Sequence, residues 1–463
     1  MRRWILPILL TVAAAMSASA SASATPTEPL NAPRLADTLN DKADYRWFLD
    51  ARFGMFIHFG LYSSIGRHSE WVMNGEELSP EAYRKYFDGF KPDLFDARAW
   101  MRAAKAAGMK YVVLTVKHHE GFVLFDSQLT DYKITNTPFH RDLVREYVDA
   151  ARAEGLKVGF YYSLVDWHHP EFPIDGHHPM RNNEAYKQAA AGRDIRKYAA
   201  YLRGQVRELL TGYGPIDYLY FDFSYAQKDW GWSKGKGAAD WQADELVKMI
   251  HQLQPKILLN NRLGIDGGGV ITPEKAQFAS DAPTDTFKLI EECNTLARSW
   301  GYVRDDHDWK SPEQLIHLLV DAVSHGNNLL LNVGPDGRGV FPPEATDRLA
   351  AFGDWMRVNS SAIYGAGRSA FAAPDGVRYT QNGKYLYAHF YTWPIESIEL
   401  PGLAGKVRTA RLFDDGAEVR FKGPEAKDPK DNLSTGVSEG AIRLLLPTAK
   451  PPSLVPVVEL TLE

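Results

Sequence analysis

The stretch Asp217-Tyr-Leu-Tyr-Phe-Asp222-Phe-Ser224 is a short apolar run that ends in a carboxylate. Upstream, residues 195–213 have the spacing of an amphipathic helix, and Gly214-Pro215 ends that pattern before the β-branched and aromatic run at 216–221. This order predicts a helix followed by a buried strand. A carboxylate at the carboxyl end of such a strand occupies the usual catalytic position of parallel α/β enzymes, although a lone aspartate there can equally cap a turn.

The same helix-and-strand unit recurs between residues 41 and 365. Further strands are predicted at 53–60, 111–116, 158–163, 257–260, 287–290 and 328–333, and helices at 97–107, 142–153, 243–253 and 312–323. Seven or eight such units favour an α/β fold with a (β/α)8-like barrel. A doubly wound open sheet is the alternative, but the first strand lacks the glycine-rich phosphate turn expected there.

The pattern changes after a predicted helix at 345–358. Short β-rich runs at 385–391, 407–413 and 457–462 are separated by Gly, Pro and Asp, and the polar stretch 423–438 is typical of an exposed loop. These features predict a small C-terminal β-sandwich domain.

The N-terminus has the pattern of a secretory signal. Arg2 and Arg3 precede a short apolar segment at 4–16, and Ala22-Ser23-Ala24 fits the small-residue cleavage rule. The apolar segment is too short to span a membrane, and no cysteine is present there to carry a lipid anchor. Since Cys293 is the single cysteine, no intramolecular disulfide can form, which suits a bacterial periplasm. We expect a signal peptide at 1–24, a catalytic barrel at 25–365 and a β-sandwich at 366–463.

Composition and missing motifs exclude several functions. The formal net charge is −5 and no basic stripe is present, so we expect no nucleic-acid partner. The sequence has no HExxH, CxxC or P-loop motif. Adjacent histidines such as His118-His119 lack ligand spacing, because neighbouring side chains on a strand point to opposite faces. We therefore expect neither a metal nor another cofactor.

Polar and aromatic residues gather where the predicted strands end. They are His58, Glu70, Trp71, His118, His119, Tyr161, Asp222, Arg262, Glu274, Glu291, Glu292 and Trp300. A barrel assembles its active site at this edge, and so many consecutive strand ends of this type are hard to explain as turn caps. Carboxylates, aromatic rings and neutral imidazoles suggest glycoside hydrolysis, in which one carboxylate attacks or activates water and another protonates the leaving oxygen.

Several motifs stand in one order along residues 41–365. They are Arg52-Phe-Gly-Met-Phe-Ile-His-Phe-Gly60, Ser69-Glu-Trp71, Leu114-Thr-Val-Lys-His-His-Glu-Gly-Phe122, Gly159-Phe-Tyr-Tyr-Ser163, Asn261-Arg262, Ser299-Trp-Gly-Tyr302 and Asn327-Asn-Leu-Leu-Leu-Asn-Val-Gly-Pro335. With this set the chain resembles the α-L-fucosidases of glycoside hydrolase family 29. The resemblance implies a distorted (β/α)8-like barrel followed by a β-sandwich, a fucosylated glycan as substrate, and hydrolysis with retention of configuration.

The resemblance also implies residue roles. Asp222 matches the nucleophile that forms a covalent fucosyl-enzyme intermediate. Trp300 stands where members place an aromatic ring against the C5 methyl group or ring face. Where the family often has Trp-Phe-Asp-Gly, this chain has Tyr220-Phe-Asp222-Phe; Tyr220 can replace the tryptophan as an aromatic wall, and we expect Phe223 to narrow the aglycone side. The residues that match sugar-binding positions are His58, Glu70, Trp71, His118, His119, Tyr161 and Arg262.

The acid/base has two candidates. Glu274, twelve residues after Arg262, matches the acid/base of one group of members, and Glu291 matches a carboxylate assigned in others. We favour Glu274; a buried partner of Arg262 or His58 is the alternative role for Glu291. Retention requires the two carboxyl groups to lie about 5 to 5.5 Å apart.

Two other functions stay open on the sequence. One is a carbohydrate-binding protein that has kept the pocket and lost catalysis, although Asp222 and both acid/base candidates are present. The other is a different retaining glycosidase such as a galactosidase, because L-fucose is 6-deoxy-L-galactose and shares the hydroxyl stereochemistry of that sugar apart from the C6 substituent. Trp300 favours a methyl group and hence fucose. The sequence leaves the fucosyl linkage undetermined.

Overall fold

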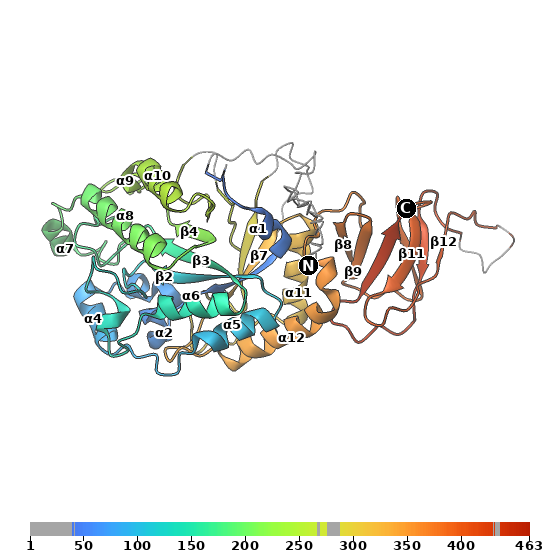
Figure 1. Cartoon of the computed structure of the whole chain (residues 1–463), viewed down its shortest axis with the longest axis horizontal. Coiled ribbons are helices and arrows are strands. Elements are labelled where there is room, and N and C mark those ends of the chain that lie inside the picture. The colour runs from blue at the N-terminus through green and yellow to red at the C-terminus, as the bar shows by residue number, and fades with distance from the viewer. Residues whose placement is uncertain (1–38, 41, 266–268, 276–287, 429, 431–435) are drawn as a thin grey trace, which may run out of the picture. The chain divides into compact units, whose positions relative to one another are not determined.

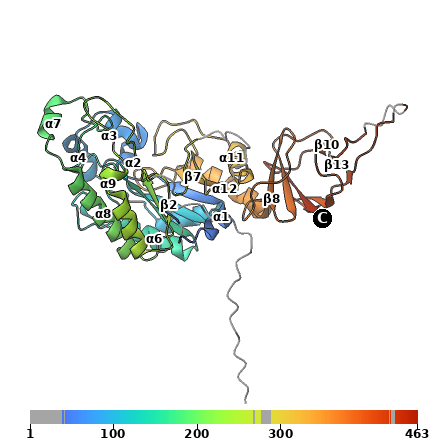
Figure 2. The ribbon, with the colours of Figure 1, turned by 90° about the horizontal axis from the view of Figure 1, so that it is seen from above.

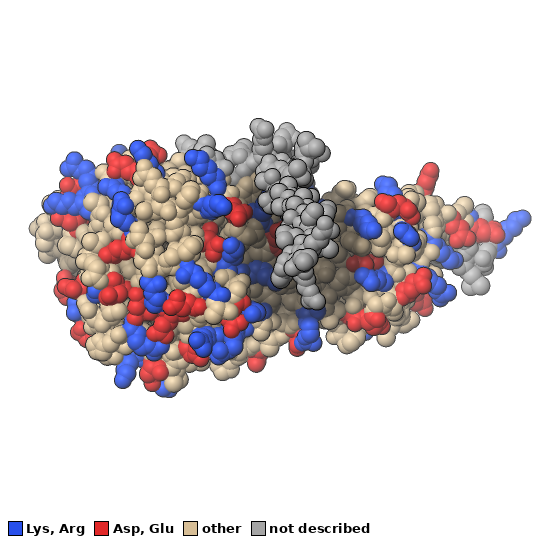
Figure 3. Space-filling view, viewed as in Figure 1, with Lys and Arg blue, Asp and Glu red and all other residues tan. Residues whose placement is uncertain are grey.

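The computed structural model describes residues 39–40, 42–265, 269–275, 288–428, 430 and 436–463. The predicted signal peptide at 1–24 lies outside the described residues. Within them, no helix combines the length and the apolar character needed to cross a membrane. On the face shown in Figure 3, Lys and Arg side chains are interspersed with Asp and Glu.

Seven parallel strands form the central sheet, as the sequence predicts (Figure 1). Their order is β5-β4-β3-β2-β1-β7-β6. The strands are β1 (Phe53–Ile57), β2 (Tyr111–Lys117), β3 (Lys157–Ser163), β4 (Tyr218–Asp222), β5 (Leu258–Leu259), β6 (Glu291–Thr295) and β7 (Asn328–Val333).

The segment at 270–274 fills the gap between the edge strands β5 and β6. Val270 bridges Asn260 on one side, while Ile271 bridges Ile290 and Glu274 bridges Cys293 on the other, all in parallel. These bridges complete the ring of strands and confirm the (β/α)8-like barrel. They also place Glu274 at its rim.

The predicted sixth strand at 287–290 is wrong in position. The strand β6 runs over Glu291–Thr295, so Glu291 and Glu292 begin it instead of following its carboxyl end. Leu289 and Ile290 supplied the apolar signal, but the strand itself is largely polar. A buried polar strand is possible because its side chains find hydrogen-bond partners inside the barrel, as described below.

Helices follow the strands and lie outside the sheet. Figure 1 shows α6 beside the strands, and the turned view in Figure 2 shows α6, α8 and α9 outside β2. The long helices are α4 (Pro80–Asp88), α5 (Ala97–Ala106), α6 (Leu143–Ala153), α8 (Ile195–Gly212), α10 (Ala243–Leu253), α11 (Pro312–Ser324) and α12 (Pro343–Asn359). The short ones are α1 (Arg46–Ala51), α2 (Leu61–Ile65), η1 (Ser69–Trp71), α3 (Val72–Gly75), η2 (Ile134–Asn136), α7 (Glu184–Ala189), α9 (Ala238–Trp241) and η3 (Ser360–Ala362).

Side-chain caps fix where several helices begin. Asp96, Asp142 and Asp194 accept hydrogen bonds from backbone N–H groups in the first turns of α5, α6 and α8. Ser311 and Gln314 form a reciprocal capping box at the start of α11. These contacts satisfy N–H groups that have no partner within the helix.

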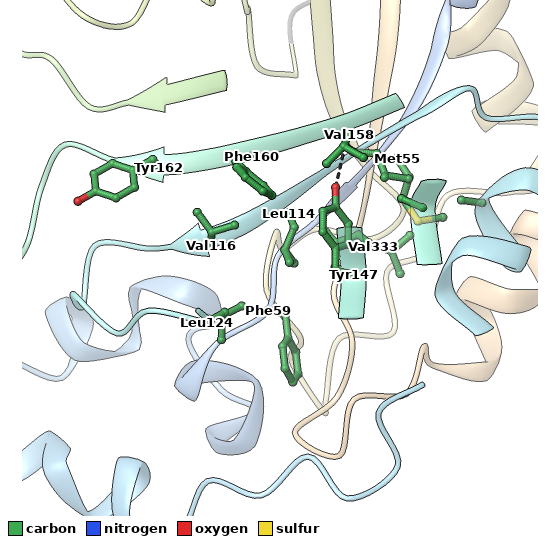
Figure 4. Packing of buried hydrophobic residues seen from close by; sticks show 14 of the residues in the cluster. Met55, Phe59, Leu114, Val116, Leu124, Tyr147, Val158, Phe160, Tyr162 and Val333 are labelled. Carbon is green, nitrogen blue, oxygen red and sulfur yellow. Dashed lines mark hydrogen bonds between the residues drawn. The ribbon is translucent and has the colours of Figure 1, made fainter. Parts of the chain in front are cut away.

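The strands are buried on both faces, with the two faces alternating along each strand. Met55, Leu114 and Phe160 pack with Tyr147 of α6 on the helix side (Figure 4). The intervening positions point into the barrel, where the interior cluster includes Phe56, Tyr111, Val113, Tyr161, Tyr218 and Tyr220. This two-residue period decides which side chains can reach a site inside the barrel.

The C-terminal strands, orange to red in Figure 1, form two antiparallel sheets. The four-stranded sheet contains β11 (Val407–Leu412), β14 (Val457–Leu462), β9 (Tyr385–Phe390) and β8 (Val377–Asn382), and the three-stranded sheet β10 (Ser397–Leu400), β13 (Ile442–Leu445) and β12 (Phe421–Lys422). Leu386 and Leu460 of one sheet share a core with Leu400 and Leu444 of the other. This core confirms the predicted β-sandwich.

Candidate active site

A pocket opens at the carboxyl ends of the barrel strands. It gathers eleven of the twelve residues predicted to be catalytic or sugar-binding, leaving out Glu291; Glu292, also predicted at a strand end, lies outside it. Its lining is Phe56, His58, Glu70, Trp71, His118, His119, Tyr161, Tyr220, Asp222, Phe223, Arg262, Glu274 and Trp300. Phe56 was not predicted as a site residue, although it lies two positions before His58 and therefore shares its face of β1.

Asp222 ends β4 inside the pocket. It lies two positions after Tyr220, so its carboxylate points into the barrel like the Tyr220 ring. Tyr161 donates its hydroxyl hydrogen to Oδ2 at 2.7 Å, and Nη1 of Arg262 donates to Oδ1 at 2.7 Å. Both carboxylate oxygens are therefore held in one orientation.

Arg262 joins the two candidate catalytic carboxylates. Its Nη1 also donates to Oε1 of Glu274 at 2.5 Å, and its Nε and Nη2 donate to the hydroxyl and carbonyl of Thr272. Burial alone would lower the pKa of Arg262, but the neighbouring Tyr220, Asp222 and Glu274 hold that pKa well above its usual value. The guanidinium is thus a permanent positive charge beside Asp222.

Hydrogen bonds fix the tautomer of His58. Nδ2 of Asn332 donates to the carbonyl of Trp300 at 2.7 Å, so its Oδ1 must be the acceptor that faces Nδ1 of His58 at 2.6 Å. His58 therefore carries its hydrogen on Nδ1 and keeps a lone pair on Nε2. Burial, and then the neighbouring His118, lower the pKa of His58 well below its usual value, so the ring is neutral at pH 7.

His119 has the same protonation. Oγ of Ser163 donates to the carbonyl of Val165 at 2.7 Å and therefore accepts from Nδ1 of His119 at 2.6 Å. Nε2 then carries a lone pair and lies 4.0 Å from Oδ2 of Asp222. Burial, and then the neighbouring His118 and His58, lower the pKa of His119 well below its usual value. Both imidazoles can accept a hydrogen bond from a ligand hydroxyl.

His118 faces a buried carboxylate that sequence reasoning missed. Its Nδ1 lies 3.5 Å from Oε2 of Glu120, and both residues are almost fully buried. Within the described part of the chain, neither Nδ1 of His118 nor either carboxylate oxygen of Glu120 has a hydrogen-bond partner. The signal was Glu120 directly after the His118-His119 pair, but its burial depends on the tertiary fold.

Two further loops complete the pocket wall. Glu70 accepts a hydrogen bond from the backbone N–H of Gly301 at 2.9 Å, which joins the loop after β1 to the loop that carries Trp300. The Trp300 ring lies 5.3 Å from the His58 ring. The Trp71 ring lies 5.1 Å from another imidazole of the pocket, that of His119. Each of these two imidazoles is therefore in contact with an indole ring.

Glu291 lies deeper in the barrel and does not reach this pocket. It is fully buried and accepts hydrogen bonds from the hydroxyls of Tyr111 at 2.5 Å and Tyr218 at 3.0 Å. Tyr218 lies four residues before Asp222 on β4, so the backbone positions of these two residues are about 13 Å apart along the strand. Burial raises the pKa of Glu291 to about 7. The alternative prediction, that Glu291 is a buried partner of Arg262 or His58, is therefore wrong about the partners, because the hydrogen bonds come from Tyr111 and Tyr218.

The site offers carboxylate and imidazole chemistry. Among the described residues, no three or more His, Cys, Asp or Glu side chains cluster in a way suited to a metal ion. A fixed carboxylate (Asp222), a solvent-exposed carboxylate (Glu274) and two neutral imidazoles line one aromatic-walled pocket. Such a site can attack a sugar carbon, exchange a proton with a leaving oxygen and bind sugar hydroxyls.

The chain is similar to known alpha-L-fucosidases in both sequence and fold. The model of the alpha-L-fucosidase family matches residues 19–361. Rat plasma alpha-L-fucosidase is 32% identical over 75% of this chain and 78% of its own length, and human tissue alpha-L-fucosidase is 30% identical over 76% of each. Among solved structures, alpha-L-fucosidase isoenzyme 1 from Paenibacillus thiaminolyticus superposes with a TM-score of 0.83 at 46% identity, over 90% of this chain and 98% of that one.

A second similar solved structure shows a reaction intermediate of another alpha-L-fucosidase. A family 29 alpha-L-fucosidase from Bacteroides thetaiotaomicron was trapped as a covalent intermediate with 2-fluoro-fucosyl fluoride. It is 26% identical with a TM-score of 0.76, over 94% of this chain and 98% of that one. The family match and the structural similarity over 90% or more of the chain lead to the same conclusion. The chain belongs to the alpha-L-fucosidase family and is a glycoside hydrolase.

Proposed function

We propose that this fucosidase releases terminal α-L-fucose from glycans with retention, with Asp222 as nucleophile and Glu274 as acid/base. One observation carries the assignment: Oδ1 of Asp222 and Oε1 of Glu274 both accept hydrogen bonds from Nη1 of Arg262. These two oxygens can therefore be no farther apart than the two distances combined, about 5.2 Å. Inverting enzymes need about 6.5 to 9.5 Å between the two carboxyl groups to admit a water molecule, so this upper bound argues against inversion and supports retention, for which about 5 to 5.5 Å is typical.

In the first step, Asp222 attacks the anomeric carbon while Glu274 protonates the departing oxygen. The bond from carbon to the leaving oxygen breaks as the bond to a carboxylate oxygen of Asp222 forms. In the second step Glu274 takes a proton from water, and the hydroxide displaces Asp222. The Glu274 side chain is 43% exposed, which suits a group that must meet both the leaving sugar and incoming water.

The remaining pocket residues hold the fucosyl ring. The Nε2 lone pairs of His58 and His119 accept hydrogen bonds from sugar hydroxyls, and Arg262 donates to sugar oxygens while it stabilises the charge on Asp222. Trp300 packs against the C5 methyl group or ring face. The other residues in this role are Glu70, Trp71, His118, Tyr161 and Tyr220.

The organisation of the chain is part of the same proposal. Residues 1–24 direct export, 25–365 form the catalytic domain and 366–463 the β-sandwich domain. Export to a bacterial periplasm would bring the enzyme to extracellular glycans. Sequencing the N-terminus of the protein recovered from the periplasm tests the cleavage site, which we expect just before Thr25.

Trapping with 2-fluoro-fucosyl fluoride tests the catalytic proposal. We expect one fluorofucosyl adduct on the peptide that contains Asp222 and no adduct with Asp222→Ala. In a separate experiment, hydrolysis of an aryl α-L-fucoside followed by NMR should give α-fucose as the first product. Asp217→Asn is the matched control, because Asp217 begins the same apolar run but pairs with Lys157 at the surface, 2.8 Å away. β-Fucose as first product, or an adduct on another residue, would overturn the assignment.

A further inference from the structure

Phe223 adopts a strained backbone conformation beside the proposed nucleophile. Its φ angle is +81°, in the left-handed region that bulky L-residues rarely adopt. Its side chain is only partly buried and lines the pocket next to Asp222. Backbone strain of this kind is retained where it places a functional group. The strained turn places an aromatic ring in the pocket lining, directly after the proposed nucleophile in the chain.

Aromatic rings continue outward from Phe223. Its ring centroid lies 5.3 Å from that of Trp71 in the pocket and 5.2 Å from that of His177. The His177 ring lies in turn 5.0 Å from the Trp230 ring. These rings come from the loops after β1, β3 and β4, which meet at the same edge of the barrel. Phe223, His177 and Trp230 each keep part of their surface exposed.

A buried ion pair holds this aromatic run in place. Asp175, fully buried, contacts Nζ of Lys236 and accepts a hydrogen bond from the Tyr225 hydroxyl at 2.7 Å. It also accepts from the backbone N–H of His177 at 2.9 Å. The pair therefore ties the loop that carries His177 to the loop that carries Trp230, so the rings are positioned before any ligand arrives.

Gly176 lets Trp230 sit close to the same loop. A Cβ atom added at Gly176 would lie 2.2 Å from Cε2 of the Trp230 indole, so only glycine leaves room for this ring. The indole is thus wedged against the backbone and lies next to the exposed end of the aromatic run. A rigid, partly exposed indole that continues a sugar pocket is suited to pack against the next sugar.

We infer that Phe223, His177 and Trp230 form a binding subsite for the sugar that carries the fucose. The inference rests on the proposed function, since it takes Asp222 as the position of the anomeric carbon. The ligand class is a neutral oligosaccharide aglycone, whose apolar C–H faces pack on the rings. The subsite makes the enzyme selective for fucosylated oligosaccharides over fucosides with a minimal leaving group.

The test compares Trp230→Ala with wild type on two kinds of substrate. α-L-Fucosyl fluoride has no sugar aglycone and reports on the fucose pocket and the chemistry alone. Fucosylated trisaccharides with α1,2, α1,3 and α1,6 linkages report on the subsite, and the one that wild type cleaves best is used for the variants. Trp232→Ala is the matched control, because Trp232 lies in the same loop, is 50% exposed, and has no ring contact with the run in the described structure.

We expect Trp230→Ala to lower kcat/KM on the trisaccharide about fivefold or more, the loss that truncating an aromatic binding residue typically causes. The rate of fucosyl fluoride hydrolysis should stay unchanged. Trp232→Ala should leave both rates unchanged. An equal loss on both substrates, or no loss on either, would overturn the subsite. Wild type that turns over neither substrate would instead refute the proposed function, so the two failures are distinguishable.

Discussion

The Tyr161 hydroxyl lies 2.7 Å from Oδ2 of Asp222, and the two residues come from the paired strands β3 and β4. This bond fixes the rotation of the proposed nucleophile, so Tyr161→Phe should slow catalysis while substrate still binds. A hydrogen bond to a charged group contributes roughly 1.5 to 3 kcal/mol, which corresponds to a loss of about 10- to 100-fold in kcat. Steady-state kinetics on an aryl fucoside measures this loss.

Tyr162→Phe is the matched control for Tyr161→Phe, because it removes the same hydroxyl group from the neighbouring residue, which points to the opposite face of β3. The Tyr162 hydroxyl donates to Oε1 of Gln205 at 2.7 Å, outside the pocket. We expect near wild-type kcat from this variant. Equal losses from Tyr161→Phe and Tyr162→Phe would mean that general damage to β3, and not the bond to Asp222, causes the effect.

The two acid/base candidates should respond differently to azide. Glu274→Ala removes the proposed proton donor from the pocket, and azide can then enter and attack the fucosyl-enzyme without needing a base. We expect activity on an aryl fucoside to rise with added azide and fucosyl azide to form. Glu291→Ala opens no path to the pocket, so azide should not raise its rate. Rescue of Glu291→Ala alone would reverse the two assignments.

The buried carboxyl of Glu291 should make stability depend on pH. Burial raises its pKa to about 7 in the folded protein, above the usual value of about 4.5 for glutamate. The folded state therefore binds the proton more tightly than the unfolded state, so protonation of Glu291 stabilises the fold. This contribution to the free energy of unfolding is complete below pH 4.5 and is lost as the pH rises through 7. Glu291→Gln mimics the protonated form at every pH.

We expect the stability of Glu291→Gln relative to wild type to rise by up to roughly 3 kcal/mol between pH 4.5 and 8. Urea unfolding of both proteins at several pH values measures the difference. Glu292, whose pKa burial raises to about 8, is present in both proteins, so its contribution cancels. Stability curves that stay parallel across this range would contradict the prediction.

The sequence predicts the barrel and most of the pocket because both depend on local patterns. Apolar runs that alternate with helices predict a parallel sheet closed into a barrel, and the period of two places His58, Tyr161 and Asp222 on the inner face. The position of β6 is not predictable in this way, since its buried polar residues depend on Tyr111 and Tyr218 from distant strands. The closing segment at 270–274 makes only isolated bridges and carries no clear strand pattern.

Glu120 also escaped prediction, and it leads to a test of how His118 is positioned. Its carboxylate is the acceptor that faces Nδ1 of His118, so it should keep the hydrogen on Nδ1 and leave the Nε2 lone pair for the sugar. The buried Tyr62 ring lies 5.5 Å from the His118 ring, and the buried Tyr83 lies near Glu120. Glu120→Gln offers an amide that can donate to Nδ1 and so reverse the tautomer.

For Glu120→Gln we therefore expect KM for fucosides to rise up to about tenfold, the size of one lost hydrogen bond between neutral groups, with a smaller change in kcat. Nitrogen-15 NMR of the histidine rings should show the His118 hydrogen on Nδ1 in wild type and on Nε2 in the variant. Glu292→Gln is the matched control, because Glu292 is a buried carboxylate that accepts from Nδ2 of Asn327 at 2.8 Å and lies outside the pocket. Loss of activity in Glu120→Gln with an unchanged His118 tautomer would mean that Glu120 acts through packing alone.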